Sequence, residues 1–372
     1  ANGIGDFNYI ESGFLALCSQ NLPDVEITDG SENFVPYVYT ANNASTRDFT
    51  GIGFAPDFLW FKDRTTALSH ALYDVVRGVN KGLQTNSTGA ENTYPVMTAF
   101  GDDGFSTATD AAVAGNLLNN STDAYVAWAW LAGTAFSNDA SATGVGTIDS
   151  SGEVNTKAGF SIIKYSGSNS AGSFAHGLSS APEFIMIKQR TESANWTVAA
   201  TVTGWTYSSD YLFLNTTAAK ATNGGSSLFT SAPSSTVVNI GGGSLTSTAG
   251  EDLIAYCFHS VEGYSKVGSY VGNGNADGTF VFTGFRPAWI LMKRSDGTEN
   301  WLIYDTERDP HNVTDEALLP NTSGSSGGSA NAMDILSNGF KFRATSGSLN
   351  ASGGNYIYLA IASQPFKFSN AR

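Results

Sequence analysis

Three aromatic residues in the middle of the chain have the types and spacing found in sugar-binding surfaces. Trp205, Tyr207 and Tyr211 fall in a polar, turn-rich stretch. Sugar C–H faces stack on aromatic rings, while sugar hydroxyls bond to neighbouring polar groups. Large aromatic side chains are buried on average, so packing in a core or subunit interface is the favoured alternative. We predict these three residues as candidate ligand-binding residues.

A second candidate is a metal-binding loop before Gly278. Asn273, Asn275 and Asp277 place side-chain oxygens at alternate positions, as in a calcium-binding loop. The loop lacks the distal bidentate glutamate, and the turns at 40–47 and 166–172 do not keep the pattern. A β-turn, in which Asn and Asp are common, is therefore the favoured interpretation over a metal site.

Patterns for catalysis are weaker still. Gly324–Gly328 fits G-x-S-x-G but lies in a Ser/Gly tract rather than at a strand-to-helix turn. The acidic pairs Asp102 with Asp103 and Asp305 with Glu307 have no acid converging on them from another element. The four histidines show no metal-ligand spacing. We predict a protein that is not an enzyme, with no catalytic residue and no cofactor.

Charge and cysteine content restrict the partners. The formal net charge of −14 argues against nucleic acid and against an anionic membrane surface. No apolar run approaches the roughly 18 residues that indicate a membrane span. Two cysteines are too few for a disulfide framework; Cys257 is predicted to be a small buried residue, and Cys18 has no assigned role.

The elements that must position these side chains come from one motif written three times. Each copy begins with proline, continues through large apolar residues and ends at lysine: Pro56–Lys62, Pro182–Lys188 and Pro287–Lys293. The apolar run does not alternate, so it predicts a strand buried on both faces. The lysine is expected to carry the chain to solvent.

Two further elements recur around this motif. One alternates small and bulky residues, which predicts a strand with two different faces; its copies are Tyr125–Trp130, Leu253–Phe258 and Leu359–Ala362. The other precedes each proline-led strand by about one hairpin, at Phe34–Tyr39, Phe160–Tyr165 and Tyr264–Tyr270. Self-similarity of this kind indicates tandem repeats.

The predicted fold is all-β, with three tandem β-sandwich repeats of jelly-roll or concanavalin-like type and an N-terminal arm. Forty-one glycines and 12% aromatic residues favour strands and turns. The predicted divisions are an arm at 1–33, repeat 1 at 34–133, a linker at 134–158, repeat 2 at 159–262 and repeat 3 at 263–372. The arm is expected to dock on its own repeats or on a neighbouring subunit.

The repeated motifs resemble those of a known group of modules. Gly-Phe-x-Pro, an aliphatic run and then Asn-Trp-x-x-Tyr-Asp appear in the third copy as Gly284–Pro287 and Asn300–Asp305. The second copy keeps Asn195-Trp196 but has Val198–Ala200 in place of Tyr-Asp. This combination resembles modules in tail-fibre-like and other virion structural proteins of tailed phages, especially phages of marine bacteria.

The resemblance implies a structural protein on the exterior of a virion, in a fibre or a capsid decoration. It implies homo-oligomers, with a trimer as the default, and contacts with other virion proteins. The alternative is a receptor-binding protein that recognises host cell-surface polysaccharide. A binder is expected to present exposed aromatic rings with polar neighbours, whereas a scaffold is expected to bury them.

Overall fold

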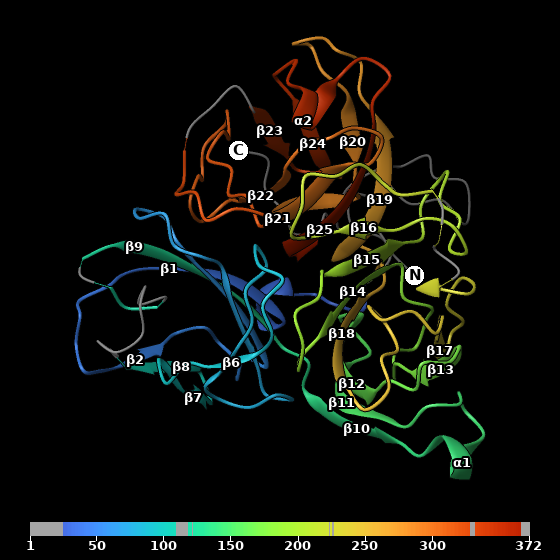
Figure 1. The fold of residues 1–372 in the computed structure, drawn as a ribbon. Coiled ribbons are helices and arrows are strands. Elements are labelled where there is room, and N and C mark those ends of the chain that lie inside the picture. Colours follow the sequence, from blue (N-terminus) through green and yellow to red (C-terminus); the bar gives the residue numbers. More distant parts are fainter. Residues whose placement is uncertain are drawn as a thin grey trace, which may run out of the picture.

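The predicted all-β class is confirmed. The computed structural model describes residues 25–108, 118–120, 122–222, 224, 227–327 and 332–365. Strands hold 44% of the residues and helices 4%, and the sheets are antiparallel. Figure 1 shows the strands gathered in three groups, which we call unit 1 (34–133), unit 2 (134–262) and unit 3 (263–365).

Each unit contains four strands in the same spatial order. The orders are β1-β9-β3-β4, β12-β18-β14-β15 and β19-β25-β21-β22. The proline-led strand is third in each, beside the alternating strand. The strands are β1 (Phe34–Thr40), β3 (Phe58–Asp63), β4 (Ala71–Asp74), β9 (Ala124–Trp130), β12 (Phe160–Ser166), β14 (Phe184–Gln189), β15 (Thr197–Ala200), β18 (Asp252–Phe258), β19 (Ser265–Val271), β21 (Phe285–Arg294), β22 (Trp301–Asp305) and β25 (Asn355–Pro365).

Smaller sheets form with strands from the same units. They are β2-β8-β7, β13-β17 and β20-β24-β23, formed by β2 (Thr46–Thr50), β7 (Met97–Gly101), β8 (Gly104–Ala108), β13 (Gly172–Ala175), β17 (Val237–Ile240), β20 (Phe280–Phe282), β23 (Met333–Leu336) and β24 (Gly339–Phe342). The short elements β5 (Lys81–Gly82), β6 (Asn92–Thr93) and α2 (Gly347–Asn350) complete units 1 and 3.

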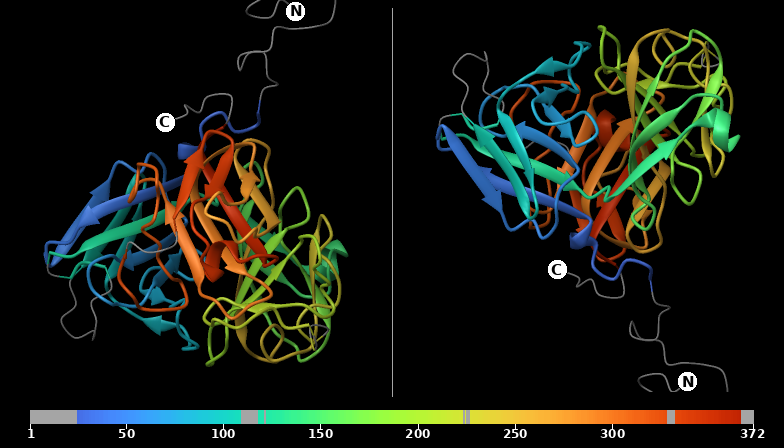
Figure 2. Two further views of the ribbon diagram at one scale, coloured as in Figure 1. Left: turned by 90° about the horizontal axis from the view of Figure 1, so that it is seen from above. Right: turned by 90° about the horizontal axis from the view of Figure 1, so that it is seen from below.

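The alternating strands separate two kinds of core, as their sequences predict. Their small residues, such as Ala127 and Ala255, face an apolar core inside their own unit. Their bulky residues, such as Trp128, Tyr256 and Leu359, join one cluster that draws from all three units. We call this cluster the shared core. Figure 2 shows the three units packed side by side.

Aromatic rings connect the units within the shared core. Trp289 of unit 3 lies 5.4 Å from Trp130 of unit 1, and Phe58 of unit 1 lies 4.7 Å from Tyr256 of unit 2. Such ring pairs stabilise beyond the area they bury. Since one core serves all three units, they are expected to fold as one cooperative body.

The predicted linker at 134–158 is wrong. This segment forms β10 (Thr134–Asn138), α1 (Ala140–Thr143) and β11 (Ser150–Asn155), and β11 pairs with the edge of β12. Together with β16 (Leu212–Phe213) it extends the unit 2 sheet to seven strands. A Cβ at Gly152 would lie within bonding distance of the Ile162 carbonyl group, so the pairing needs glycine there. The linker-like composition of this segment did not reveal that it forms a hairpin, which covers an edge of the unit 2 sheet.

The end of the predicted arm contacts the chain's own units. Ile27 is buried in the shared core, and the 3-10 helix η2 (Gly30–Glu32) follows it. The Gln364 side chain donates to the Asp29 carboxylate at 2.8 Å. Residues 1–24, including Cys18, lie outside the described residues.

Candidate functional site

The boundaries between units repeat one hydrogen bond in the same rotational sense. A ring N–H in each unit meets a backbone carbonyl of the next unit at 2.9 to 3.1 Å. The pairs are Trp196 with Gln84, Trp301 with Phe213, and His70 with Leu319. Because the His70 Nδ1 atom accepts from Trp60, its Nε2 atom carries the proton that is donated to Leu319. The three units therefore close into a ring.

Two of the three boundaries also contain a buried ion pair. Asp305 binds Arg308 at 2.6 Å and accepts from the Trp128 indole of unit 1 at 2.9 Å. Asp74 binds Arg77 in the same way and accepts from Tyr256 of unit 2. All four charged side chains are fully buried.

The third boundary is apolar at the positions of this ion pair. Strand register places Ala200 where the other units have Asp74 and Asp305. It places Leu359 where the others have Trp128 and Tyr256. Donor and acceptor are thus both present or both absent, as expected if unpaired buried polar groups are costly.

The expectation that the motif lysine reaches solvent is wrong. Lys62, Lys188 and Lys293 are fully buried at the unit boundaries. Their ammonium groups donate to backbone carbonyls, and Lys188 and Lys293 each reach one on the neighbouring unit, at Thr88 and Thr217. Burial lowers the pKa of each lysine to about 8. The charged form is held in place by neutral oxygen atoms.

These lysines predict a stability that rises with pH. Above about pH 8 the folded protein releases protons that the unfolded chain still binds, so the free energy of unfolding increases. We expect a gain of about 1 kcal/mol for each lysine, or about 3 in all, between about pH 7.5 and 9. Denaturant titrations at several pH values measure it.

Another buried group that titrates at high pH decides which variant this measurement is made in. Burial raises the pKa of the Cys257 thiol to about 12, which acts in the opposite direction above pH 8. The measurement therefore uses the Cys257→Ala variant. Alanine is the residue that unit 1 has at the corresponding position, Ala129. Lys188→Met should remove about a third of the gain. A flat profile in the alanine background would contradict the assignment.

A groove crosses the boundary between units 2 and 3 and is the candidate binding site. Two hollows, of about 490 and 230 Å3, share Val202 and Thr203 of unit 2 and Ser269 and Tyr270 of unit 3. Both hollows lie along β19, which is the edge strand of the unit 3 sheet and pairs with β25. We call this combined depression the β19 groove. Its walls come from the turn after β15 on one side and from β19 and β20 on the other.

Aromatic and apolar side chains line or border the β19 groove. Phe280 and Phe282 are 43% and 57% exposed, and Val271 is 55% exposed. Trp205 is half-buried at the unit 2 wall, where the Lys220 ammonium lies 5.4 Å from the centre of its ring. Large apolar side chains exposed together in one place indicate a surface that contacts something else.

Comparison with known families places the chain in one of them. A model of a domain of unknown function, DUF7483, matches residues 29–365. The chain belongs to the DUF7483 family. No curated protein matches the sequence. In the DUF7483 chain, no helix among the described residues is long and apolar enough to cross a membrane.

The three predicted aromatic residues occupy different environments in this DUF7483 chain. Trp205 lines the β19 groove. Tyr207 is buried in the unit 2 core, and its hydroxyl pairs with Thr201 at 2.9 Å. Tyr211 is half-buried against the same core, beside Phe213. Sequence reasoning thus found one groove residue, while Lys266, Phe280 and Phe282 gave no signal because their setting depends on the neighbouring unit.

The side chains of the predicted metal loop bond within the DUF7483 chain. The Asn273 and Asn275 side-chain oxygens accept from the backbone N–H groups of Asn275 and Asp277. Asp277 pairs with Lys341 at 2.6 Å. This is the hydrogen bonding of successive Asx turns. Among the described residues, no group of three or more His, Cys, Asp or Glu side chains could hold a metal ion.

One acid of each pair considered for catalysis has a structural partner. Asp305 is buried and forms an ion pair with Arg308 at the end of β22. Asp103 accepts from the backbone N–H groups of Gly51 and Gly53. Hydrogen bonds to the charged form lower the pKa of the Asp103 carboxyl.

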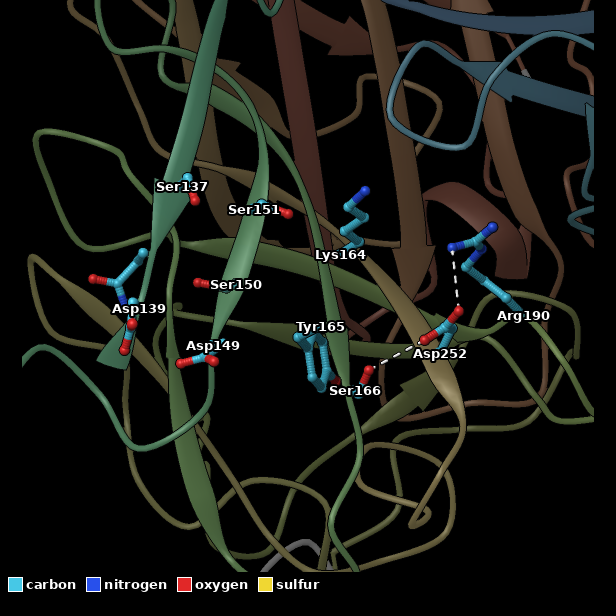
Figure 3. Close-up of a pocket in the computed structure, with 11 residues that line it drawn as sticks. Ser137, Asp139, Asp149, Ser150, Ser151, Lys164, Tyr165, Ser166, Arg190 and Asp252 are labelled. Atoms are coloured by element: carbon cyan, nitrogen blue, oxygen red, sulfur yellow. Dashed lines mark hydrogen bonds and ion pairs between the residues drawn. The ribbon is translucent and has the colours of Figure 1, made fainter. Parts of the chain in front are cut away.

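A separate polar hollow of about 400 Å3 lies on unit 2 (Figure 3). Asp252 contacts Ser166 and Arg190 at one side, at 3.1 and 3.9 Å. At the other side the Asp139 and Asp149 carboxylates accept from the backbone N–H groups of α1. These acids serve the fold, so this hollow is a weaker candidate than the β19 groove.

Proposed function

We propose that the chain is a non-enzymatic structural component on the exterior of a tailed-phage particle, in a fibre or a decoration. The observation that carries the proposal is the ring, in which one shared core and repeated boundary bonds join all three units. Such a body transmits load without hinges between its units. The phage setting rests on the sequence resemblance.

Locating the protein in particles tests this function. An antibody raised against the purified chain would be used for immunogold labelling of particles of the phage that encodes it, alongside peptide mass spectrometry of those particles. Label on the outer surface is the expected result. Many labelled positions over the shell would indicate decoration, whereas label at one vertex would indicate a fibre. Absence of the chain from purified particles would overturn the proposal.

Self-association is part of this proposal. A homotrimer remains the default expectation for a fibre protein. The ring already supplies a threefold arrangement of similar units within one chain, so a further trimer would use the outer surfaces of the units. Light scattering across a range of protein concentrations measures the assembly state, and a stable monomer at micromolar concentration would remove homo-oligomers from the proposal.

A second candidate function is recognition of a cell-surface polysaccharide. The specific observation that favours it is the β19 groove, where Phe280 and Phe282 are exposed and Trp205 forms part of the wall. The hydroxyl groups of Thr201, Thr203 and Ser269 line the same groove. Aromatic faces with hydroxyl neighbours suit sugar rings.

A further inference from the structure

The charge of the β19 groove differs from that of the chain. The chain carries 33 acidic and 19 basic residues. Among the described residues that line the two hollows of the groove, two are lysines, Lys220 and Lys266, and none is acidic. A groove whose charged lining residues are lysines attracts anionic ligands and gives neutral ones no charge–charge attraction.

We propose that the β19 groove binds an acidic polysaccharide, whose carboxylate groups meet Lys266 while its sugar rings lie against Phe280, Phe282 and Trp205. This inference rests on the second function proposed above and specifies its ligand class. The groove consists of two adjoining hollows that share lining residues across the boundary between units 2 and 3, so it offers space for several consecutive sugar units.

Lys266 is the residue best placed for the anionic group. Its ammonium donates to the Phe282 carbonyl at 3.0 Å and lies 5.3 Å from the centre of the Phe282 ring. Among the described residues, no carboxylate lies within ion-pair distance of it. Lys220, in contrast, is already paired with Asp210 at 2.5 Å. Lys266 therefore has donors left for a ligand beside an exposed ring.

An added peptide strand fits the groove less well than a glycan. The outward backbone groups at the start of β19 are occupied, because Val261 and Ser265 pair with each other and the Val267 N–H donates to Ser260. At the other end, the Val271 carbonyl accepts from Thr279. A strand that docks on a sheet edge needs a row of free backbone groups. Only the middle of β19 offers them.

Binding of defined polymers to the full chain tests the inference. Polygalacturonate and alginate serve as acidic probes, dextran as the neutral probe and poly-glutamate as an acidic peptide, each followed by isothermal titration calorimetry. Lys266→Gln and Phe282→Ala are expected to weaken binding of an acidic polysaccharide about tenfold, the effect of losing one charged or stacking contact. Added salt should weaken the wild-type binding as well.

Lys164→Gln is the matched control, because Lys164 lies on β12 where unit 3 has Ser269 and it lines the polar hollow of unit 2. It should bind like the wild type, and circular dichroism checks that every variant is folded. Equal binding of dextran would overturn the acidic ligand while keeping glycan recognition. Binding of no polysaccharide would overturn both. Tighter binding of poly-glutamate, or unchanged binding by Lys266→Gln, would also overturn the inference.

Discussion

Replacing Trp289 by alanine is expected to lower the free energy of unfolding by about 3–5 kcal/mol, the cost of removing a large side chain from a well-packed core. Trp289 is 1% exposed. Its ring lies 5.4 to 6.4 Å from the rings of Phe34, Trp60, Trp128 and Trp130, all of which belong to unit 1. The cavity would therefore open between units rather than within one.

The lower free energy of unfolding should apply to all three units, which should unfold together in a single transition. Chemical denaturation followed by both far-UV circular dichroism and tryptophan fluorescence measures it, and the two probes should coincide. Trp289→Phe should lower the free energy of unfolding less than Trp289→Ala does. Phenylalanine is the residue that the other units have at the corresponding positions, Phe58 and Phe184. Phe282→Ala, on the surface, should change stability little. Hydrogen exchange showing unit 2 still protected after unit 3 opens would contradict one shared core.

The sequence was sufficient to predict the three recurring strands of each unit and their faces. The proline-led runs and the small–bulky alternation depend on burial within one strand, so local pattern carries the information. Proline positions agree with the lack of an N–H donor: Pro56 and Pro182 precede their strands, and Pro287 lies at a register shift in β21. Cys257 is buried and free, as its placement predicted.

Features that depend on neighbouring units could not be predicted. The buried lysines find their oxygen partners across the unit boundaries or in adjacent turns, which no local pattern reveals. Strand register places Tyr358 at the position that corresponds to Ala127, although Tyr358 lies before the predicted third copy at Leu359–Ala362. The alternation has a period of two, so a shift of two residues keeps small and bulky side chains on the same faces of the strand. The pattern therefore cannot reveal such a shift.

The β19 groove was only partly predictable for the same reason. Trp205 stood out because it falls in a polar stretch of unit 2. Lys266, Phe280 and Phe282 belong to unit 3 and resemble ordinary strand residues until the fold leaves them exposed beside that turn. The acidic composition of the whole chain concealed a groove in which the charged residues are lysines.

Asp305→Ala is expected to cost about 3–5 kcal/mol of unfolding free energy, the effect of removing one partner from a buried ion pair. The substitution leaves the Arg308 guanidinium fully buried and without a counter-charge, with the carbonyls of Ile303 and Glu316 and the Ser326 hydroxyl as its remaining partners among the described residues. It also leaves the Trp128 indole N–H without its acceptor. Both losses fall at the boundary between units 1 and 3. Denaturant titration at neutral pH measures them.

The cost should come mainly from the unpaired charge, and a second variant tests this. Asp305→Ala combined with Arg308→Met removes both charges and should be more stable than Asp305→Ala alone, because apolar replacement of a buried pair is often neutral. The boundary between units 2 and 3 is a natural example of such an apolar arrangement. It has Ala200 and Leu359 at the positions that correspond to Asp305 and Trp128. A double variant no more stable than the single one would show that the Trp128 contact, not the charge, dominates this boundary.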